Sequence, residues 1–265
     1  MLFSSEFLFR ELGEARALDL LESEVDAAGL GTIRILLLIR NPIEFTGSFW
    51  QQHIKTGGGD VDIEDFFKNN LWTSRVCNFI EDVHSRQRFS LHVANYSVHR
   101  QNLLSLVTEW LGVPPDALVQ PDFEKVNRSL TPAELELQRR INRRLGQGAP
   151  AIATRFVERL PEHPHSVILP DLEVQRAAWD QMFPAIERIN AHLPEAERYR
   201  QDFCDPPPRA SEFVFDAAQL DVVAELIAEL SETARHLRAS ALSNASGWAL
   251  GRALLARIAR RLRLR

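Results

Sequence analysis

Cysteine is scarce in this chain, and long apolar runs are missing. Only Cys77 and Cys204 occur among 265 residues, so a disulfide framework is not expected, and neither has the spacing of a metal site. No apolar stretch reaches membrane-spanning length, and the N-terminus lacks the basic start and the small-residue cleavage site of a signal peptide. We therefore expect a cytoplasmic protein.

Several catalytic and binding signatures are also missing. Nothing resembles a Ser-His-Asp arrangement or the paired carboxylates of a glycosidase. His163-Pro-His165 has no nearby carboxylate or cysteine partners, which is typical of a surface turn, so no metal site is predicted. The net charge is −5, and the basic C-terminal segment has no interleaved aromatic residues, which argues against nucleic-acid binding.

The composition is that of a globular protein. Apolar residues make up 45% of the chain, enough to bury a core as one large domain or as one domain with an appendage. Helical and strand patterns alternate as in an α/β fold. We expect strands at 32–39 and 88–95 and helices at 7–28, 43–54, 63–81 (one or two helices), 103–111 and 132–145, the last with Thr131 as N-cap and Glu134 in a capping box.

The most informative segment surrounds Arg40. Residues 32–39 form an apolar run of the kind that is buried on both faces of a parallel sheet, and Arg40 lies at its carboxyl end. Asn41 and Pro42 then start a helix that carries Ser48. Ligands of open α/β sheets bind outside the carboxyl ends of the strands, so a guanidinium and a hydroxyl at this edge predict a phosphate site.

The Arg-Asn-Pro turn with Ser48 eight residues after Arg40 resembles the element with which sulfotransferases hold the 3′-phosphate of 3′-phosphoadenosine 5′-phosphosulfate (PAPS). Further blocks follow in the family's order, at 2–6, 51–55, 91–96 and 123–130. The resemblance implies a three-layer, P-loop-like parallel sheet flanked by helices, truncated at its N-terminus, with a mostly helical C-terminal half. It also implies PAPS as co-substrate and an acceptor that is a small molecule or a glycan.

Site residues follow from the resemblance. Glu6 would be the catalytic base, although Ser4, Ser5 and Glu6 also fit a cap of the first helix. Tyr96 would lie near the adenine, or else pack at a strand end with a solvated hydroxyl. Asn127 and Arg128 would belong to a loop that closes over the nucleotide, although this block departs from the Arg-Lys-Gly loop of the animal cytosolic enzymes.

One element of the family is missing from the sequence. Only three residues precede Ser4, which leaves no room for the strand and the Lys-bearing glycine loop that hold the 5′-phosphosulfate. The glycine cluster at 55–59 follows a helix, which is the wrong context for a phosphate loop. Three hypotheses stay open: a sulfotransferase, a non-catalytic relative that binds or assembles, and a chain whose start lies upstream.

The composition changes near the C-terminus. We divide the chain into a sulfotransferase-like domain (1–203), a Pro-rich linker (204–212) and a helical appendage (213–265). A small-residue break is expected at 240–247, before an amphipathic helix at 248–265 with six arginines and no acidic residue. This helix would dock on the acidic remainder of the chain or be disordered, or it would make weak contact with an anionic membrane surface.

Overall fold

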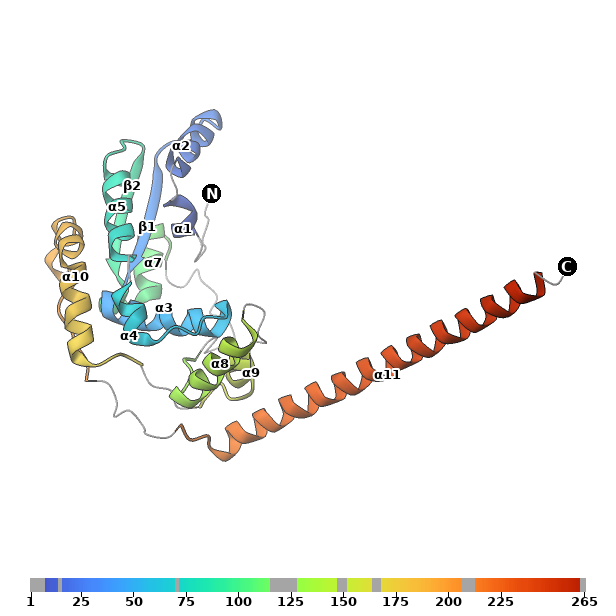
Figure 1. Cartoon of the computed structure of the whole chain (residues 1–265). Helices are drawn as coiled ribbons and strands as arrows, with labels where there is room; N and C mark the ends of the chain where they lie inside the picture. Colours follow the sequence, from blue (N-terminus) through green and yellow to red (C-terminus); the bar gives the residue numbers. More distant parts are fainter. Residues whose placement is uncertain are drawn as a thin grey trace.

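The computed structural model describes residues 8–13, 16–69, 72–114, 128–146, 152–163, 168–205 and 213–262. Helices dominate these residues and surround a small sheet, so the predicted mixed α/β character is confirmed (Figure 1). In chain order the elements are α1 (Leu8–Leu12), α2 (Ala17–Ala27), β1 (Ile33–Ile39), α3 (Pro42–Gly57), α4 (Ile63–Lys68), α5 (Trp72–His84), β2 (Phe89–Asn95), α6 (Tyr96–His99), α7 (Leu103–Leu111), α8 (Pro132–Leu145), α9 (Ile152–Arg159), α10 (Leu172–Ala191), the 3₁₀ turn η2 (Glu195–Glu197) and α11 (Ala217–Leu262).

The sheet of the described residues is a parallel pair. β1 and β2 are in register from Ile33 opposite Phe89 to Ile39 opposite Asn95. Parallel strands require a crossover, and here α3, α4 and α5 supply it. Both strands therefore end at the same edge, which is the edge at which the sequence predicts the phosphate site.

β1 is less buried than its apolar sequence predicts. Ile39 is buried, but Leu38 is 40% exposed and Arg34 is exposed as well. The alternate residues of the strand pack on a cluster formed with α1, α2 and α5; these are Ile33, Ile35 and Leu37. Burial on both faces is therefore wrong for the described residues, because an apolar run does not by itself say how many faces are covered.

The main hydrophobic core lies between the carboxyl end of the sheet and the helices α3, α4, α5, α8, α9 and α10. Ile39 and Val93 contribute from the two strands. The side chains in this core with the least exposure include Ile43, Ile54, Phe67, Ile80, Leu135, Phe156, Ile186 and Ile189. The packing fixes the start of α3, and with it the edge that carries Arg40.

α3 begins as the sequence predicts, but it ends at Gly57, three residues later than the predicted end. The Asn41 side chain accepts a hydrogen bond from the Ile43 N–H at 3.0 Å, and Pro42 occupies the first turn. At the other end Gly58 closes the helix with φ 68°. The glycine cluster at 55–59 thus includes the last turn of α3, where carbonyl groups rather than N–H groups are left without helical partners, which is not the context of a phosphate loop.

Replacing Gly47 of α3 by alanine should destabilise the protein by about 1 kcal/mol or more, because overpacking outweighs the gain in helix propensity. An added Cβ would lie 2.8 Å from Leu169 Cδ2 and 3.0 Å from the Ile168 carbonyl oxygen. Urea unfolding measures the effect. The exposed Gln52→Ala change in the same helix is the control, and a Gly47→Ala variant more stable than the wild type would contradict the close approach.

Two helix predictions are wrong. The helix expected at 7–28 is two helices, since α1 ends at Leu12 with Gly13 after it and α2 starts at Ala17. The break expected at 240–247 is absent, because α11 runs unbroken from Ala217 to Leu262. Serine, asparagine and glycine each cost about 1 kcal/mol or less in a helix, and this stretch has no proline.

α11 leaves the body of the molecule (Figure 1). Its 46 residues span about 69 Å at about 1.5 Å per residue. The early turns contact the body, with Val222 buried in the core, whereas residues 231–240 are exposed throughout. This course contradicts the predicted docking of the C-terminal segment on the body. Of the predicted linker, residues 206–212 lie outside the described residues.

Candidate functional site

The carboxyl edge of the sheet is held together by side chains that cap the strand ends. The Asn41 N–H donates to Ser97 Oγ at 3.1 Å, and Ser97 Oγ donates to Glu44 Oε2 at 3.3 Å. Asn41 Nδ2 also donates to the Arg200 carbonyl at 3.1 Å, and the Asn95 side chain caps α6 by accepting from the Ser97 N–H at 3.1 Å. The ends of β1 and β2 are therefore tied into one rigid platform.

Arg40 lies on this platform, and its guanidinium has N–H donors that no described residue uses. Its Nε donates to Glu44 Oε2 at 3.1 Å, and its guanidinium carbon lies 5.7 Å from the centre of the Tyr96 ring. The side chain keeps 28% of its surface exposed. Among the described residues Arg40 makes no other hydrogen bond, so both terminal nitrogens remain available to an oxyanion. Glu44 fixes the orientation of the guanidinium through Nε and leaves its two terminal nitrogens unoccupied.

Ser48 shares a helix face with this pair. It follows Glu44 by four residues and Arg40 by eight, and residues four apart are neighbours on a helix surface. Ser48 is exposed, and within the described residues its hydroxyl has no hydrogen bond. The structure therefore brings Arg40 and Tyr96 together and places Ser48 on the same side of α3. The other predicted residues Glu6 and Asn127 lie outside the described residues.

Sequence reasoning missed a carboxylate at the end of β2. Glu197, in η2, accepts from the Asn95 N–H at 2.6 Å and lies 2.5 Å from Nε2 of His99. About a hundred residues separate this carboxylate from its partners, so no local pattern could have found it. Glu44 did carry a local signal, because it follows Arg40 by four residues at the start of a helix.

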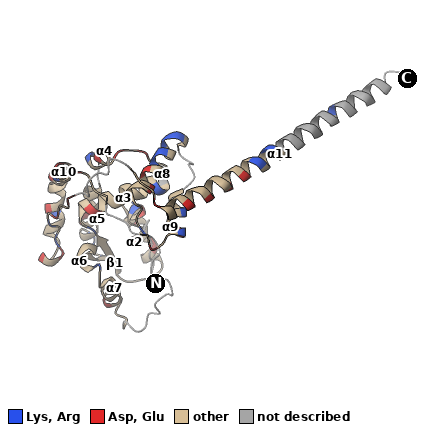
Figure 2. Ribbon diagram, turned by 90° about the horizontal axis from the view of Figure 1, so that it is seen from below, with Lys and Arg blue, Asp and Glu red and all other residues tan. Residues whose placement is uncertain are grey.

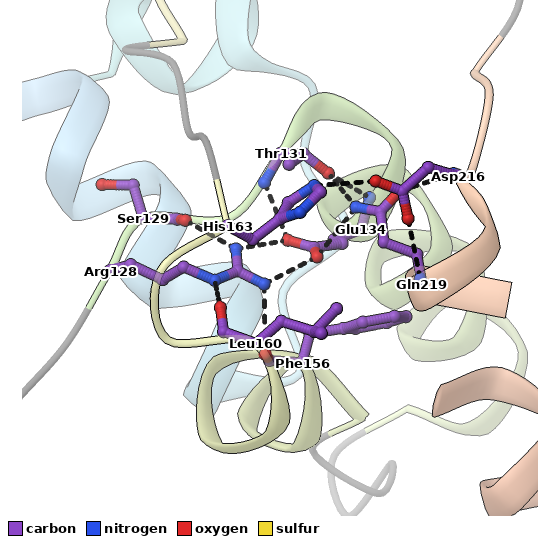
Figure 3. Close-up of polar contacts among 9 residues, drawn as sticks. All are labelled: Arg128, Ser129, Thr131, Glu134, Phe156, Leu160, His163, Asp216 and Gln219. Atoms are coloured by element: carbon purple, nitrogen blue, oxygen red, sulfur yellow. Dashed lines mark hydrogen bonds and ion pairs between the residues drawn. The ribbon is translucent and has the colours of Figure 1, made fainter. Parts of the chain in front are cut away.

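Arg128 is placed in the core instead of at the platform (Figure 3). Its guanidinium forms a paired contact with the Glu134 carboxylate, with both N–O distances at 2.7 Å. The remaining N–H groups donate to backbone carbonyls of Leu160, Ser129 and Phe156. All five donors of a guanidinium are then in use, so none is left for a phosphate. We assign Arg128 to the core and correct its predicted nucleotide contact.

Glu134 is the centre of this buried network. Its carboxylate also accepts from the Thr131 N–H at 2.9 Å and from Gln219 Nε2 at 2.9 Å (Figure 3). Burial alone would raise the pKa of Glu134, but the hydrogen bonds from Arg128, Thr131 and Gln219 lower the pKa below its usual value. The capping box predicted for Thr131 and Glu134 is confirmed, and the same carboxylate joins α8 to the start of α11.

A hollow of about 380 Å³ lies between α1 and α5, and it is lined by Phe9, Arg10, Leu12, Gly13, Trp72, Arg75, Asn78, Phe79 and Asp82. Trp72 forms one wall, and the Arg75 guanidinium lies 5.4 Å from the centre of its ring. The outer face of Trp72 meets Phe45 and Phe49 of α3 edge-on. An aromatic cluster therefore connects this hollow to the helix that carries Ser48.

The described residues carry neither a candidate membrane span nor a cluster of metal ligands. None of the helices there is long and apolar enough to cross a membrane. No group of three or more His, Cys, Asp or Glu side chains is arranged to hold a metal ion in that part of the chain. His163 lies 3.6 Å from Asp216, at the start of α11 (Figure 3).

Comparison with known proteins gives no neighbour to argue from. No family model matches the chain, and neither a curated protein nor a solved structure matches it. The function must therefore be argued from the carboxyl edge of the sheet itself.

Proposed function

We propose that this chain binds a 3′-phosphorylated adenine nucleotide at the carboxyl edge of β1 and β2. The observation that carries the proposal is the guanidinium of Arg40, which is held by Glu44 through Nε and keeps both terminal nitrogens unpaired among the described residues. Two parallel N–H donors match two oxygens of a phosphate. Ser48, on the same helix face, would add a hydroxyl donor.

Tyr96 gives the proposed site a place for the nucleoside. Its ring lies next to the Arg40 guanidinium and follows directly after β2. An aromatic ring at the end of a strand offers a stacking surface for adenine, and the guanidinium beside it would bind the 3′-phosphate of the same nucleotide. The resemblance of the Arg-Asn-Pro turn to the sulfotransferase element supports this same nucleotide.

The reaction we propose is sulfuryl transfer from PAPS to a hydroxyl of a carbohydrate, a lipid or a small metabolite. Transfer of an SO₃ group requires that the leaving phosphate be neutralised and that the acceptor lose a proton, for which Glu6 remains the proposed base. The hollow beside Trp72 is the proposed acceptor site, since its aromatic walls suit an apolar ring and the Arg75 guanidinium suits an acidic group. In this proposal β1 and β2 belong to a three-layer, P-loop-like sheet.

One observation favours the alternative, nucleotide binding without transfer. The glycine cluster at 55–59 ends α3 and presents a helix C-terminus, which repels a phosphosulfate instead of cradling it. Incubation with PAPS labelled in the sulfate separates the two functions. Transfer of label to an acceptor supports the enzyme, particularly if Glu6→Gln abolishes it, whereas tight binding without transfer supports the non-catalytic relative.

We expect the wild type to bind 3′-phosphoadenosine 5′-phosphate more tightly than AMP, and Arg40→Ala to abolish that preference. The lost charge-assisted contact should cost on the order of 2 to 4 kcal/mol in binding free energy. Isothermal calorimetry with both nucleotides measures it. Arg40→Lys should retain only part of the preference for the 3′-phosphorylated nucleotide, because an ammonium keeps the positive charge but lacks the two parallel N–H donors of a guanidinium.

Arg34→Ala is the matched control for this measurement. Arg34 lies on β1, six residues before Arg40, and its Nη2 donates to the Trp110 carbonyl at 2.5 Å, away from the platform. Its removal should leave both nucleotide affinities unchanged. Equal affinities of the wild type for the two nucleotides would refute the proposed site.

A further inference from the structure

Glu197 and His99 form a largely buried carboxylate–imidazole pair at the carboxyl end of β2. Glu197 Oε1 lies 2.5 Å from His99 Nε2, and the two side chains keep 15% and 18% of their surface exposed. The contacts proposed for the nucleotide do not use this pair. Ligands of open α/β sheets bind at this edge, so the pair lies where it can contact one.

Glu197 is held in place on the end of the strand. Its other carboxylate oxygen, Oε2, accepts from the Asn95 N–H at 2.6 Å, and Asn95 Nδ2 donates to the Glu197 carbonyl at 3.2 Å. Both the side chain and the backbone of Glu197 are therefore tied to the last residue of β2. An ionised carboxylate can only accept hydrogen bonds, so the ring nitrogen of His99 that faces it carries the proton.

The other ring nitrogen of His99 is left as a hydrogen-bond acceptor. In a neutral imidazole one nitrogen donates and the other accepts, so a proton on Nε2 leaves a lone pair on Nδ1. Nδ1 has no hydrogen bond within the described residues. It is also not among their buried polar atoms that lack a partner, so it reaches the surface. His99 thus presents a lone pair whose direction Glu197 fixes.

α6 places this lone pair on the platform of the proposed nucleotide site. Tyr96 and His99 are the first and last residues of α6, and residues three apart are neighbours on a helix surface, with Cβ atoms about 5 to 6 Å apart. The start of α6 is bound to the end of β1 through the hydrogen bond from the Asn41 N–H to Ser97 Oγ. Figure 2 shows α6 beside β1. A nucleotide that stacks on Tyr96 would therefore have His99 at its edge.

The chemistry around Nδ1 decides which group of a ligand can face it. A lone pair next to the Glu197 carboxylate repels phosphate oxygens, which are acceptors themselves, and favours an O–H or N–H donor. The 3′-phosphate is left to the Arg40 guanidinium. In an adenosine that is phosphorylated at the 3′ and 5′ positions, the remaining donors are the ribose 2′-hydroxyl and the 6-amino group of adenine.

We propose that His99, oriented by Glu197, selects the nucleoside by accepting a hydrogen bond at Nδ1 from the ribose 2′-hydroxyl or from the adenine 6-amino group. The inference rests on the proposed nucleotide site. It makes His99 a residue that determines specificity and Glu197 its positioning residue. A site that pairs with a donor rejects an analogue that lacks it, because the polar atom of the site is then left unpaired.

Isothermal calorimetry with three ligands tests the proposal. The parent is 3′-phosphoadenosine 5′-phosphate, one analogue has hydrogen in place of the 2′-hydroxyl, and the other has hydrogen in place of the 6-amino group. The wild type should bind the parent at least about tenfold more tightly than one of the analogues, and the rejected analogue identifies the donor. Equal affinities for all three ligands would overturn the proposal.

His99→Phe should remove this discrimination, because a phenyl ring has no lone pair to offer. Its affinities for the parent and for the rejected analogue should then agree within about threefold. His99→Asn should restore part of the discrimination, because an amide oxygen can accept in place of Nδ1. His236→Phe is the matched control. The His236 side chain is 80% exposed on α11, so this variant should discriminate like the wild type.

The preference for 3′-phosphoadenosine 5′-phosphate over AMP separates this inference from the proposed function. Arg40 is expected to supply that preference, so His99→Phe and Glu197→Ala should keep it while they lose the discrimination between parent and analogue. A wild type without the preference over AMP would overturn the proposed site and this inference with it. His99→Phe that keeps both the preference and the discrimination would overturn this inference alone, and loss of both would show that His99 only supports the fold.

The tautomer of His99 can be observed without any nucleotide. Long-range ¹H–¹⁵N spectra of the full chain, assigned by comparison with His99→Phe, should show a proton on Nε2 and none on Nδ1 above neutral pH. A proton on Nδ1 instead would overturn the proposal, because no acceptor would then face the ligand.

Discussion

Glu134→Gln should lower the free energy of unfolding by about 3 to 5 kcal/mol, measured by urea unfolding at neutral pH. The side chains of Arg128 and Glu134 are 1% and 0% exposed, so the substitution leaves a guanidinium buried without a counter-charge. Three carbonyl groups still accept hydrogen bonds from Arg128, but they carry no net charge. Breaking one partner of a buried ion pair costs far more than removing both.

Two comparisons separate this effect from a general loss of an ion pair. Glu225→Gln breaks the pair with Arg159, in which both side chains are 56% exposed, and should cost no more than about 1 kcal/mol. The double replacement of Arg128 by Met and Glu134 by Leu should recover much of the lost stability, because no charge is then buried. A single variant within about 1 kcal/mol of the wild type would show that the carbonyl groups alone satisfy Arg128.

The pH dependence gives a second check on the same pair. Because the pKa of Glu134 is lowered in the folded state, its stabilising effect is fully present above the unfolded value of about 4.3 and is lost as the pH falls through the folded value. The stability difference between the wild type and Glu134→Gln should therefore shrink as the pH falls below about 4. A difference that stays constant down to the lowest pH at which the protein folds would mean that the carboxylate is not ionised in the folded state.

Features set by neighbouring residues could be read from the sequence. The caps of α3 and α8 each involve residues no more than three positions apart: Asn41 with Pro42, and Thr131 with Glu134. Their geometry therefore follows from the backbone of the first helical turn. The two strands were also predictable, because a short run rich in β-branched residues and leucine, bounded by turns, is typical of a β-strand. Their parallel pairing follows from the helices between them.

The different roles of the two arginines could not be read in the same way. Arg40 and Arg128 both stand next to an asparagine at the edge of a predicted helix. Two of the carbonyl groups that accept from Arg128 belong to Phe156 in α9 and to Leu160 just after it, about thirty residues later, and their positions are set by how α9 packs on α8. Only the tertiary structure shows that all donors of the Arg128 guanidinium are bound in the core, whereas the two terminal nitrogens of Arg40 have no hydrogen-bond partner among the described residues.

The course of α11 was mispredicted for an energetic reason. Small residues were expected to end the helix, yet their propensity cost in the stretch at 240–247 is spread over many helical hydrogen bonds. Each of these residues costs about 1 kcal/mol or less, and none of them is proline, so the helix continues through the stretch.

Phe156→Ala should destabilise the protein by about 3 to 5 kcal/mol, measured by urea unfolding. Phe156 is fully buried in the main core, and its ring stacks on that of Phe215 with centres 5.9 Å apart. The substitution removes this contact and leaves a cavity between α9 and the segment that leads into α11. The backbone carbonyl of residue 156 stays in place, so the hydrogen bond from Arg128 Nη2 can persist.

Phe213→Ala is the matched control, because the same truncation at a side chain that is 49% exposed should change stability by no more than about 0.5 to 1 kcal/mol. Combining Phe156→Ala with Glu134→Gln should give less than the sum of the two losses, since both changes loosen the contact among α8, α9 and α11. Strict additivity would contradict that coupling. A small effect of Phe156→Ala alone would show that α9 does not pack on the core, and the carbonyl groups that hold Arg128 would then lose their support.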